Sequence, residues 1–236
     1  MAAEKANAVF QRVEKKYLLT EQKYKDFCDR ISPYMEIDQY GKHTICNIYY
    51  DTDTYWLIRN SIEKPKYKEK IRLRSYGVPN ESSKVFLEIK KKSKGIVYKR
   101  RIQLTLKEAE NYLERGIKPG EDSQIFREID YFVKFYHPEK KLYLAYDRIA
   151  MFGKEDPEIR LTVDQNIRSR QYDLSLSKGD YGDKLMEENA YLLEIKVANA
   201  FPMWLATILS ELEIYPSSFS KYGNIYKKSI IKEGVV

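Results

Sequence analysis

The sequence predicts an α+β fold in which strands form a barrel and helices pack around its outside. Four segments alternate charged and apolar residues with a period of two, so each would be a strand with one charged and one apolar face. These segments are 68–74, 85–90, 158–164 and 192–197. In an ordinary sheet the charged faces would meet water, whereas in a closed barrel they would line the lumen. Helical segments are available to cover the apolar faces, so in a barrel the apolar faces would pack on helices and the charged faces would line the lumen.

The segment 68–76 has the clearest alternation. Its row of cations from Lys68 to Arg74 would project from one face, and Ile71 and Leu73 would project from the other. Neighbouring cations in such a row lie about 7 Å apart and repel one another unless an anion lies between them. The row therefore favours an anionic ligand.

The other strands are predicted from runs of β-forming residues that end at turn signals. In chain order the predicted strands are 12–19, 43–51, 68–76, 84–92, 96–104, 141–149, 158–164 and 191–197. The phase of 96–104 is ambiguous, because Lys99, Arg100 and Arg101 are consecutive and one of them must face outward. Residues 166–190 are polar and irregular, which indicates a mobile loop.

Helices are predicted where a capping residue precedes an apolar stripe. Thr20 can cap a helix that runs to about Ile31, with Pro33 after its end. Thr105 and Glu108 form a capping box. The predicted helices are 20–31, 105–115, 122–136 and 202–212, and residues 52–67 form a short helical turn and a loop.

The composition predicts a soluble, cytoplasmic globular chain, or the soluble part of a larger protein, with an anionic partner. The 236 residues carry a formal net charge of +7, and the pI is about 9.0. Two cysteines, Cys28 and Cys46, and two histidines, His43 and His137, argue against a disulfide framework and a histidine-based zinc site. The sequence has no signal peptide and no apolar run near the roughly 20 residues that span a bilayer. It also has no linker, so one domain over 1–236 is expected.

The predicted lumen combines many cations with few carboxylates. Its acids are Glu14, Glu88, Asp164 and Glu194. Arginine binds phosphate oxygens bidentately, and lysine supplies a point charge. Carboxylates together with phosphate oxygens and water form the hard oxygen shell that Mg²⁺ or Mn²⁺ prefers. The pattern therefore indicates a chain of phosphates with a divalent metal, and it argues against a nucleic-acid duplex, which could not reach an enclosed row of charges.

Seven short motifs follow one another along the chain. They are Glu14-x-Lys16, Arg72-x-Arg74, Glu88-x-Lys90, Lys99-x-Arg101, Arg148, Arg160 and Glu194-x-Lys196. Their order resembles the triphosphate tunnel metalloenzymes, the CYTH-like group. Three phrases are similar to one branch of that group, the VTC domain of polyphosphate polymerases: Lys70-Ile71-Arg72-Leu73-Arg74-Ser75-Tyr76, Tyr146-Asp147-Arg148 and Ser218-Phe219-Ser220-Lys221-Tyr222. The resemblance runs from about Arg12 to Tyr226.

The resemblance implies a closed eight-stranded antiparallel tunnel in which the γ-phosphate of ATP is transferred to a growing polyphosphate chain. It implies catalytic roles for Arg72, Arg74, Lys90, Arg148 and Lys196. It implies substrate binding by Lys16, Lys99, Arg101, Arg160 and Lys221. It gives Glu194 as the main ligand of Mn²⁺ or Mg²⁺, with Glu14 and Glu88 as weaker metal candidates. The partners would be ATP and inorganic polyphosphate, with room for a membrane partner that receives the product.

Two alternatives of the same fold stay open: a triphosphatase, and a non-catalytic module that binds polyphosphate or inositol phosphates. Hydrolytic members of the group typically begin with Glu-x-Glu-x-Lys, and Arg12 replaces the first acid in this chain. Fewer carboxylates activate water less well, whereas an attacking phosphate oxygen is already anionic and needs no general base. The sequence therefore favours polymerisation. Arg72→Ala or Arg74→Ala is expected to lose activity with little loss of stability, because one cation leaves a repulsive cluster.

Overall fold

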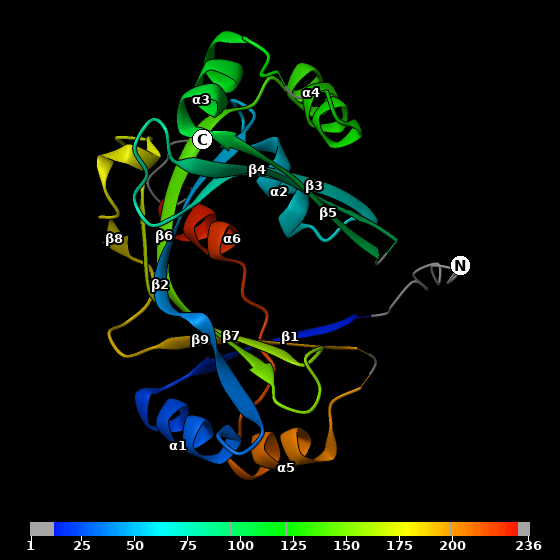
Figure 1. Cartoon of the computed structure of the whole chain (residues 1–236), viewed down its shortest axis with the longest axis vertical. Helices are drawn as coiled ribbons and strands as arrows, with labels where there is room; N and C mark the ends of the chain where they lie inside the picture. Colours follow the sequence, from blue (N-terminus) through cyan, green and yellow to red (C-terminus); the bar gives the residue numbers. More distant parts are fainter. Residues whose placement is uncertain (1–11, 95, 121, 199, 231–236) are drawn as a thin grey trace. The chain divides into compact units, whose positions relative to one another are not determined.

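The computed structural model describes residues 12–94, 96–120, 122–198 and 200–230 (Figure 1). Its contacts divide the chain into two compact units, each assembled from three segments. Unit 1 consists of Met1–His43, Asp147–Gln165 and Glu187–Phe219. Unit 2 consists of Thr44–Tyr146, Asn166–Met186 and Ser220–Val236. The single domain that the sequence led us to expect stays a prediction.

Unit 1 contains antiparallel strands with two helices on one face. β1 (Arg12–Leu19) pairs along its whole length with β9 (Tyr191–Ala198), and β9 also pairs with the first part of β7 (Arg160–Arg170). The helices α1 (Glu21–Ile31) and α5 (Met203–Glu211) lie side by side (Figure 1). Their apolar side chains pack on the apolar residues of these strands. The charged residues alternate with the apolar ones, so they project from the other face.

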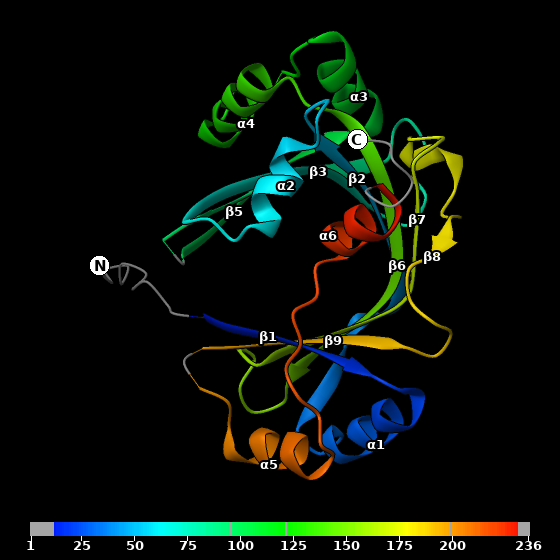
Figure 2. The ribbon, with the colours of Figure 1, turned by 180° about the vertical axis from the view of Figure 1, so that it is seen from behind.

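Unit 2 contains a run of antiparallel strands formed by successive segments. β3 (Tyr67–Tyr76), β4 (Lys84–Ser93) and β5 (Ile96–Thr105) pair in sequence order, and β2 (Met35–Asp51) pairs with β3 (Figure 2). The helices α2, α3 and α4 pack against these strands. The apolar core of the unit includes alternate residues of β3, β4 and β5.

The remaining elements complete the two units. They are α2 (Trp56–Ile62), α3 (Leu106–Arg115), α4 (Gln124–Tyr136), β6 (Glu139–Gly153), the 3₁₀ turn η1 (Leu176–Lys178), β8 (Asp183–Lys184), α6 (Lys221–Ile225) and the π-helical turn η2 (Tyr226–Ile230). Two predicted caps are confirmed: Thr20 accepts a hydrogen bond from the backbone N–H of Lys23, and Thr105 forms a capping box with Glu108. Among the described residues, each helix is too short or too polar to cross a membrane.

The strands form one large sheet with the order β1-β9-β7-β6-β2-β3-β4-β5, and β8 lies beside β7. Eight strands lie along this path, which is the number that the family resemblance implied. The α+β class and the large antiparallel sheet are therefore confirmed. Within the part of the chain that the structure describes, no strand pairing joins β1 to β5. Closure into a barrel is thus not confirmed and stays a prediction.

Residues 166–190 are more ordered than the sequence suggested, because Arg170 is buried among them. β7 continues to this residue, which is 2% exposed. Its guanidinium lies 3.5 Å from the ring centroid of Tyr143 and 4.2 Å from that of Tyr181. It also donates hydrogen bonds to the backbone carbonyls of Asp173, Ser175 and Tyr181. A polar stretch is thus held in place by one cation, which hydropathy alone does not reveal.

Candidate phosphate-binding site

Unit 1 has a polar face on the strands β1, β9 and β7. The strand register places Glu14 opposite Lys196 and Lys16 opposite Glu194, while Thr162 and Arg160 lie on the far side of Glu194 and Lys196. Directly opposed residues in antiparallel strands project to the same face. We call this surface the unit 1 polar face; its residues are Glu14, Lys16, Arg148, Arg160, Thr162, Asp164, Glu194 and Lys196.

Glu194 lies between two lysines of the unit 1 polar face. It forms an ion pair with Lys196, and its Oε2 lies 3.8 Å from the Nζ of Lys16. The Nζ of Lys16 also donates to the backbone carbonyl of Phe219 at 3.0 Å. Burial alone would raise the pKa of Glu194, but Lys196 and Lys16 outweigh it and lower the pKa to about 2. The carboxylate is therefore ionised at neutral pH, as an oxygen ligand for a cation must be.

Arg148 is fixed on the same face by a buried acid. Its Nε and Nη2 donate to the two carboxylate oxygens of Asp164 at 2.6 and 2.8 Å. Asp164 is only 1% exposed, so this bidentate pair orients the guanidinium strongly. Arg160 is exposed by contrast, and it lies directly across from Lys196. The face thus combines one arginine that is paired with a buried acid and one arginine that is exposed.

Unit 2 has a second polar face, on β2, β3, β4 and β5. The register pairs Arg72 with Tyr49 and Glu88, and it pairs Arg74 with Asn47 and Phe86. β5 continues the face, because Arg101 lies opposite Glu88 and Lys99 lies opposite Lys90. We call this surface the unit 2 polar face; its residues are Asn47, Tyr49, Arg72, Arg74, Glu88, Lys90, Lys99, Arg101, Tyr146 and Lys221.

Arg72 lies at the centre of the unit 2 polar face. Its Nε and Nη2 both contact Oε2 of Glu88 at 2.7 Å, and its Nη1 donates to the Tyr49 hydroxyl at 3.1 Å. Burial tends to raise the pKa of Glu88, but Arg72 and Arg74 lower it below its usual value. Burial likewise tends to raise the pKa of Tyr49, but the charges of Arg72, Arg74 and Lys70 lower it to about 8. The cations therefore dominate the local potential.

Arg74 is held by uncharged partners as well as by Glu88. Its Nε donates to Oδ1 of Asn47 at 3.0 Å, and its Nη2 donates to the hydroxyl of Tyr146 at 3.2 Å. Asn47 is completely buried, and its own amide donates to the Leu144 carbonyl at 3.1 Å. The Nζ of Lys221 lies 4.5 Å from the ring centroid of Tyr146. Tyr146 thus links Arg74 and Lys221, two of the predicted phosphate ligands.

The short helix α6, which carries Lys221, is held by a buried carboxylate. The Tyr222 hydroxyl donates to Oδ2 of Asp51 at 3.0 Å. Asp51 is 0% exposed, and it also accepts the backbone N–H groups of Thr52, Leu57 and Ile58. This network joins the start of α2 to α6 and fixes the backbone beside Lys221.

A profile of the VTC domain matches residues 11–230, which is nearly the whole chain. The chain belongs to the VTC domain family. The predicted membership is thus confirmed. A search of curated proteins finds no match for this VTC domain.

Solved structures with the same fold include three proteins described as candidate adenylate cyclases. The VTC domain is 15% identical to one from Bacillus halodurans, with a TM-score of 0.57 and coverage of 92% of this chain and 97% of that chain. It is 18% identical to one from Hippeastrum described as having a dominant triphosphatase activity, with a TM-score of 0.54 and coverage of 92% and 95%. It is 11% identical to one from Vibrio parahaemolyticus, with a TM-score of 0.50 and coverage of 93% and 99%. At these identities the likeness shows the fold alone.

The residues predicted for metal binding lie in two places in the VTC domain. Glu194 and Glu14 share the unit 1 polar face, whereas Glu88 belongs to the unit 2 polar face, in ion pairs with Arg72 and Arg74. Among the described residues, no three side chains of His, Cys, Asp or Glu gather as a metal site would require. The donors still fit a hard divalent cation if phosphate oxygens and water supply most of its ligands.

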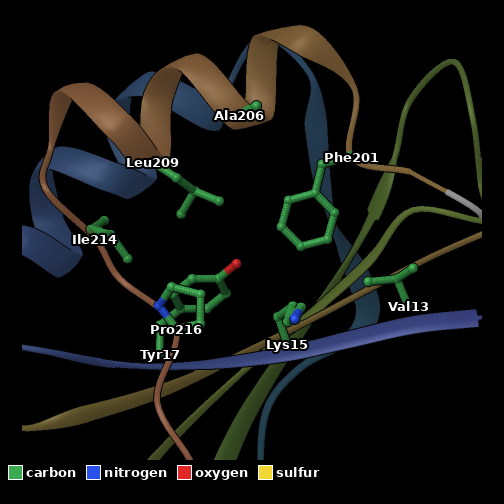
Figure 3. Close-up of a pocket in the computed structure, with 8 residues that line it drawn as sticks. All are labelled: Val13, Lys15, Tyr17, Phe201, Ala206, Leu209, Ile214 and Pro216. Carbon is green, nitrogen blue, oxygen red and sulfur yellow. The ribbon is translucent and has the colours of Figure 1, made fainter.

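A pocket of about 400 Å³ lies in unit 1, away from the polar face (Figure 3). It is lined by Val13, Lys15, Tyr17, Phe201, Ala206, Leu209, Ile214 and Pro216. The lining residues of β1 alternate with Glu14 and Lys16, so they belong to the face that α5 covers. This pocket is mostly apolar and contains none of the predicted phosphate ligands.

Sequence reasoning missed three residues of the VTC domain that support the predicted phosphate ligands. Asn47 and Tyr49 alternate on β2 and bond Arg74 and Arg72, and Tyr222 anchors α6. The alternation of Asn47, Tyr49 and Asp51 was a signal that these side chains share one face. The register of β2 against β3, which brings them to the arginines, was not visible in the sequence.

Proposed function

We propose that this VTC domain is a metal-dependent polyphosphate polymerase that transfers the γ-phosphate of ATP to a growing polyphosphate chain. The observation that supports this most is the chemistry of the two polar faces. Cations outnumber carboxylates by six to one on the unit 2 polar face and by four to three on the unit 1 polar face, and Glu88, Asp164 and Glu194 are each paired with a cation. Such a surface binds and neutralises phosphates well, but it offers little to deprotonate a water molecule.

In the proposed reaction a terminal oxygen of polyphosphate attacks the γ-phosphorus of ATP. A P–O bond forms to the acceptor, the bond from the γ-phosphorus to the β,γ-bridging oxygen breaks, and ADP leaves with that oxygen. The nucleophile is already anionic, so no general base is required. Arg72, Arg74 and Lys90 would bind phosphates in unit 2, and Arg148 and Lys196 would do so in unit 1. Their work is to position the reactants and to neutralise charge as it moves.

The remaining predicted ligands would hold the nucleotide and the chain. We assign Lys16, Lys99, Arg101, Arg160 and Lys221 to substrate binding. The resemblance of the motifs implies that both polar faces line one tunnel, and closure of the eight strands into a barrel is part of the proposal. ATP and inorganic polyphosphate would be the partners, and the protein would act in the cytoplasm, with room for a membrane partner that takes the product.

Glu194 would be the main protein ligand of Mn²⁺ or Mg²⁺, with Glu14 beside it and Glu88 as a weaker candidate. The support is that Glu194 is held ionised and presents a hard oxygen donor. A bound divalent cation would neutralise charge on the phosphate oxygens. Lys16 and Lys196 pair with the Glu194 carboxylate. A cation bound to Glu194 would leave these two lysines available to bind phosphate.

The decisive assay is to incubate the protein with ATP and Mn²⁺ and to separate the products on a gel. The proposal expects a polymer ladder together with ADP. Orthophosphate and ADP without polymer would instead support a triphosphatase. That second candidate is favoured by the shared fold with the Hippeastrum protein, which is described as a triphosphatase.

A non-catalytic binder of polyphosphate or inositol phosphates is separated from both enzymes by Glu194→Gln. In an enzyme this variant loses metal-dependent turnover. Metal-free binding of tripolyphosphate is retained or becomes tighter, because Lys16 and Lys196 are released from the carboxylate. Glu211→Gln is a matched control, since Glu211 pairs with Arg30 on the outer helices. A wild-type protein that binds tripolyphosphate but turns over no ATP would be a binder.

A further inference from the structure

The unit 2 polar face continues beyond its predicted phosphate ligands as a ladder of lysines. The register places Lys70 opposite Lys90 and Lys68 opposite Lys92, and Lys90 is also opposite Lys99. Two pairs between β3 and β4 and one pair between β4 and β5 therefore place lysine opposite lysine. Directly opposed like charges destabilise a sheet, and the charge of Lys92 acts on Lys68 across the two strands.

A lysine on the other face of the same strands has an acidic partner. Lys91 lies opposite Glu69, and the Nζ of Lys91 is 3.6 Å from the Glu69 carboxylate. The face that carries Lys68, Lys70 and Lys92 differs in its supply of acids. β3, β4 and β5 contribute one carboxylate to it, Glu88, and Glu88 is bonded to Arg72. Lys91 thus lies opposite an acid on one face, whereas Lys68 and Lys70 lie opposite lysines on the other.

We propose that Lys68, Lys70 and Lys92 form a track that binds the distal phosphates of a long polyphosphate chain. The inference rests on the proposed function and adds a preference for chain length to it. From Arg74 to Lys68 the row spans about 20 Å of strand, with a cation at every second residue. A linear polyanion that starts at the arginines can follow this row outward, whereas a triphosphate cannot reach its end.

Lys68 is already positioned for such a role. Its Nζ donates to the Ser61 carbonyl in the last turn of α2 at 3.0 Å, which uses one of the three donors of the ammonium group. Burial lowers the pKa of Lys68, and the nearby charges of Lys92 and Lys64 lower it further. An anion between Lys68 and Lys92 would relieve that repulsion. If Lys68 served only the end of α2, its removal would change stability and not chain-length preference.

The test compares Lys68→Ala/Lys92→Ala with Lys25→Ala/Lys107→Ala, a control that removes two exposed helical lysines and the same charge. Binding of tripolyphosphate and of polyphosphate tens of phosphates long is measured at several salt concentrations. The track variant is expected to lose about tenfold in affinity for the long chain, with a smaller salt dependence. Its affinity for tripolyphosphate, and both affinities of the control, should change less than twofold.

Lys68→Arg/Lys92→Arg keeps both charges and should retain the long-chain affinity, which excludes misfolding as the cause. Equal losses in the track variant and the control would overturn the track. So would a wild-type affinity that does not rise with chain length, while polymer synthesis from ATP could still stand. A wild-type protein that binds neither ligand would overturn the track and the proposed function together.

Discussion

Removal of Arg72 should destabilise the fold as well as the proposed activity. Arg72→Ala takes away two contacts of 2.7 Å from Glu88, whose side chain is 14% exposed, and one hydrogen bond from Tyr49. Breaking a buried ion pair typically costs about 3–5 kcal/mol. Arg72 itself is 29% exposed, and Arg74 remains 3.7 Å from Glu88. We therefore expect a loss of about 2–3 kcal/mol in the free energy of unfolding.

Urea unfolding measures this loss, and the midpoint should fall by about 1 M. In the wild type the pKa of Glu88 is lowered, so its contribution is present above its unfolded pKa and is lost as the pH falls through the folded value. In Arg72→Ala the largest charge that lowers the pKa of Glu88 is gone, so Glu88 takes up a proton more readily. The difference in the free energy of unfolding between the wild type and Arg72→Ala should therefore become smaller in acid. The double variant Arg72→Ala/Glu88→Gln should recover part of the loss. Lys107→Ala, which breaks an exposed pair, should have little effect. An unchanged midpoint in Arg72→Ala, or a double variant as unstable as the single one, would refute this reasoning.

Three further variants test other contacts. The tripolyphosphate affinity of the wild type should fall above about pH 8, because the phenolate of Tyr49 forms there and pairs with Arg72. Tyr49→Phe should show no such fall, and equal pH profiles for the two proteins would contradict this. Because the pKa of Tyr49 is lowered by folding, the wild type should also gain stability over Tyr49→Phe between about pH 8 and 10. Tyr222→Phe should lower the free energy of unfolding by about 1–2 kcal/mol, since Asp51 loses a donor, and urea titration would detect it. Thr162→Val should leave the melting temperature unchanged or raise it, because the buried hydroxyl has no hydrogen-bond partner among the described residues; a lower melting temperature would show a hidden one.

The sequence predicted which residues share a face because side-chain direction follows strand period. Arg72 and Arg74 on β3 and Glu194 and Lys196 on β9 were identified in this way, and the register confirms that each pair shares one face. The phase of β5 could not be read from three consecutive cations. The register settles it, since Arg101 faces Glu88.

The partners of the charges were beyond the sequence, because they depend on strand register and on burial. A repulsive cluster suggested that Arg72→Ala would cost little stability. The structure places Glu88 and Tyr49 against that guanidinium, so the expectation reverses. The roles of these residues in binding and turnover stay predictions that the assays above address.

The burial of Arg170 has a consequence for how the chain opens. Its guanidinium donates to three carbonyls between Asp173 and Tyr181, and both ring contacts bury it further. Residues 173–181 should not unfold one at a time, because each step would remove a hydrogen-bond acceptor from a guanidinium that stays buried. Amide hydrogens there should therefore exchange with solvent in one cooperative event, as slowly as those of neighbouring strands, and not at the rate of an ordinary surface loop.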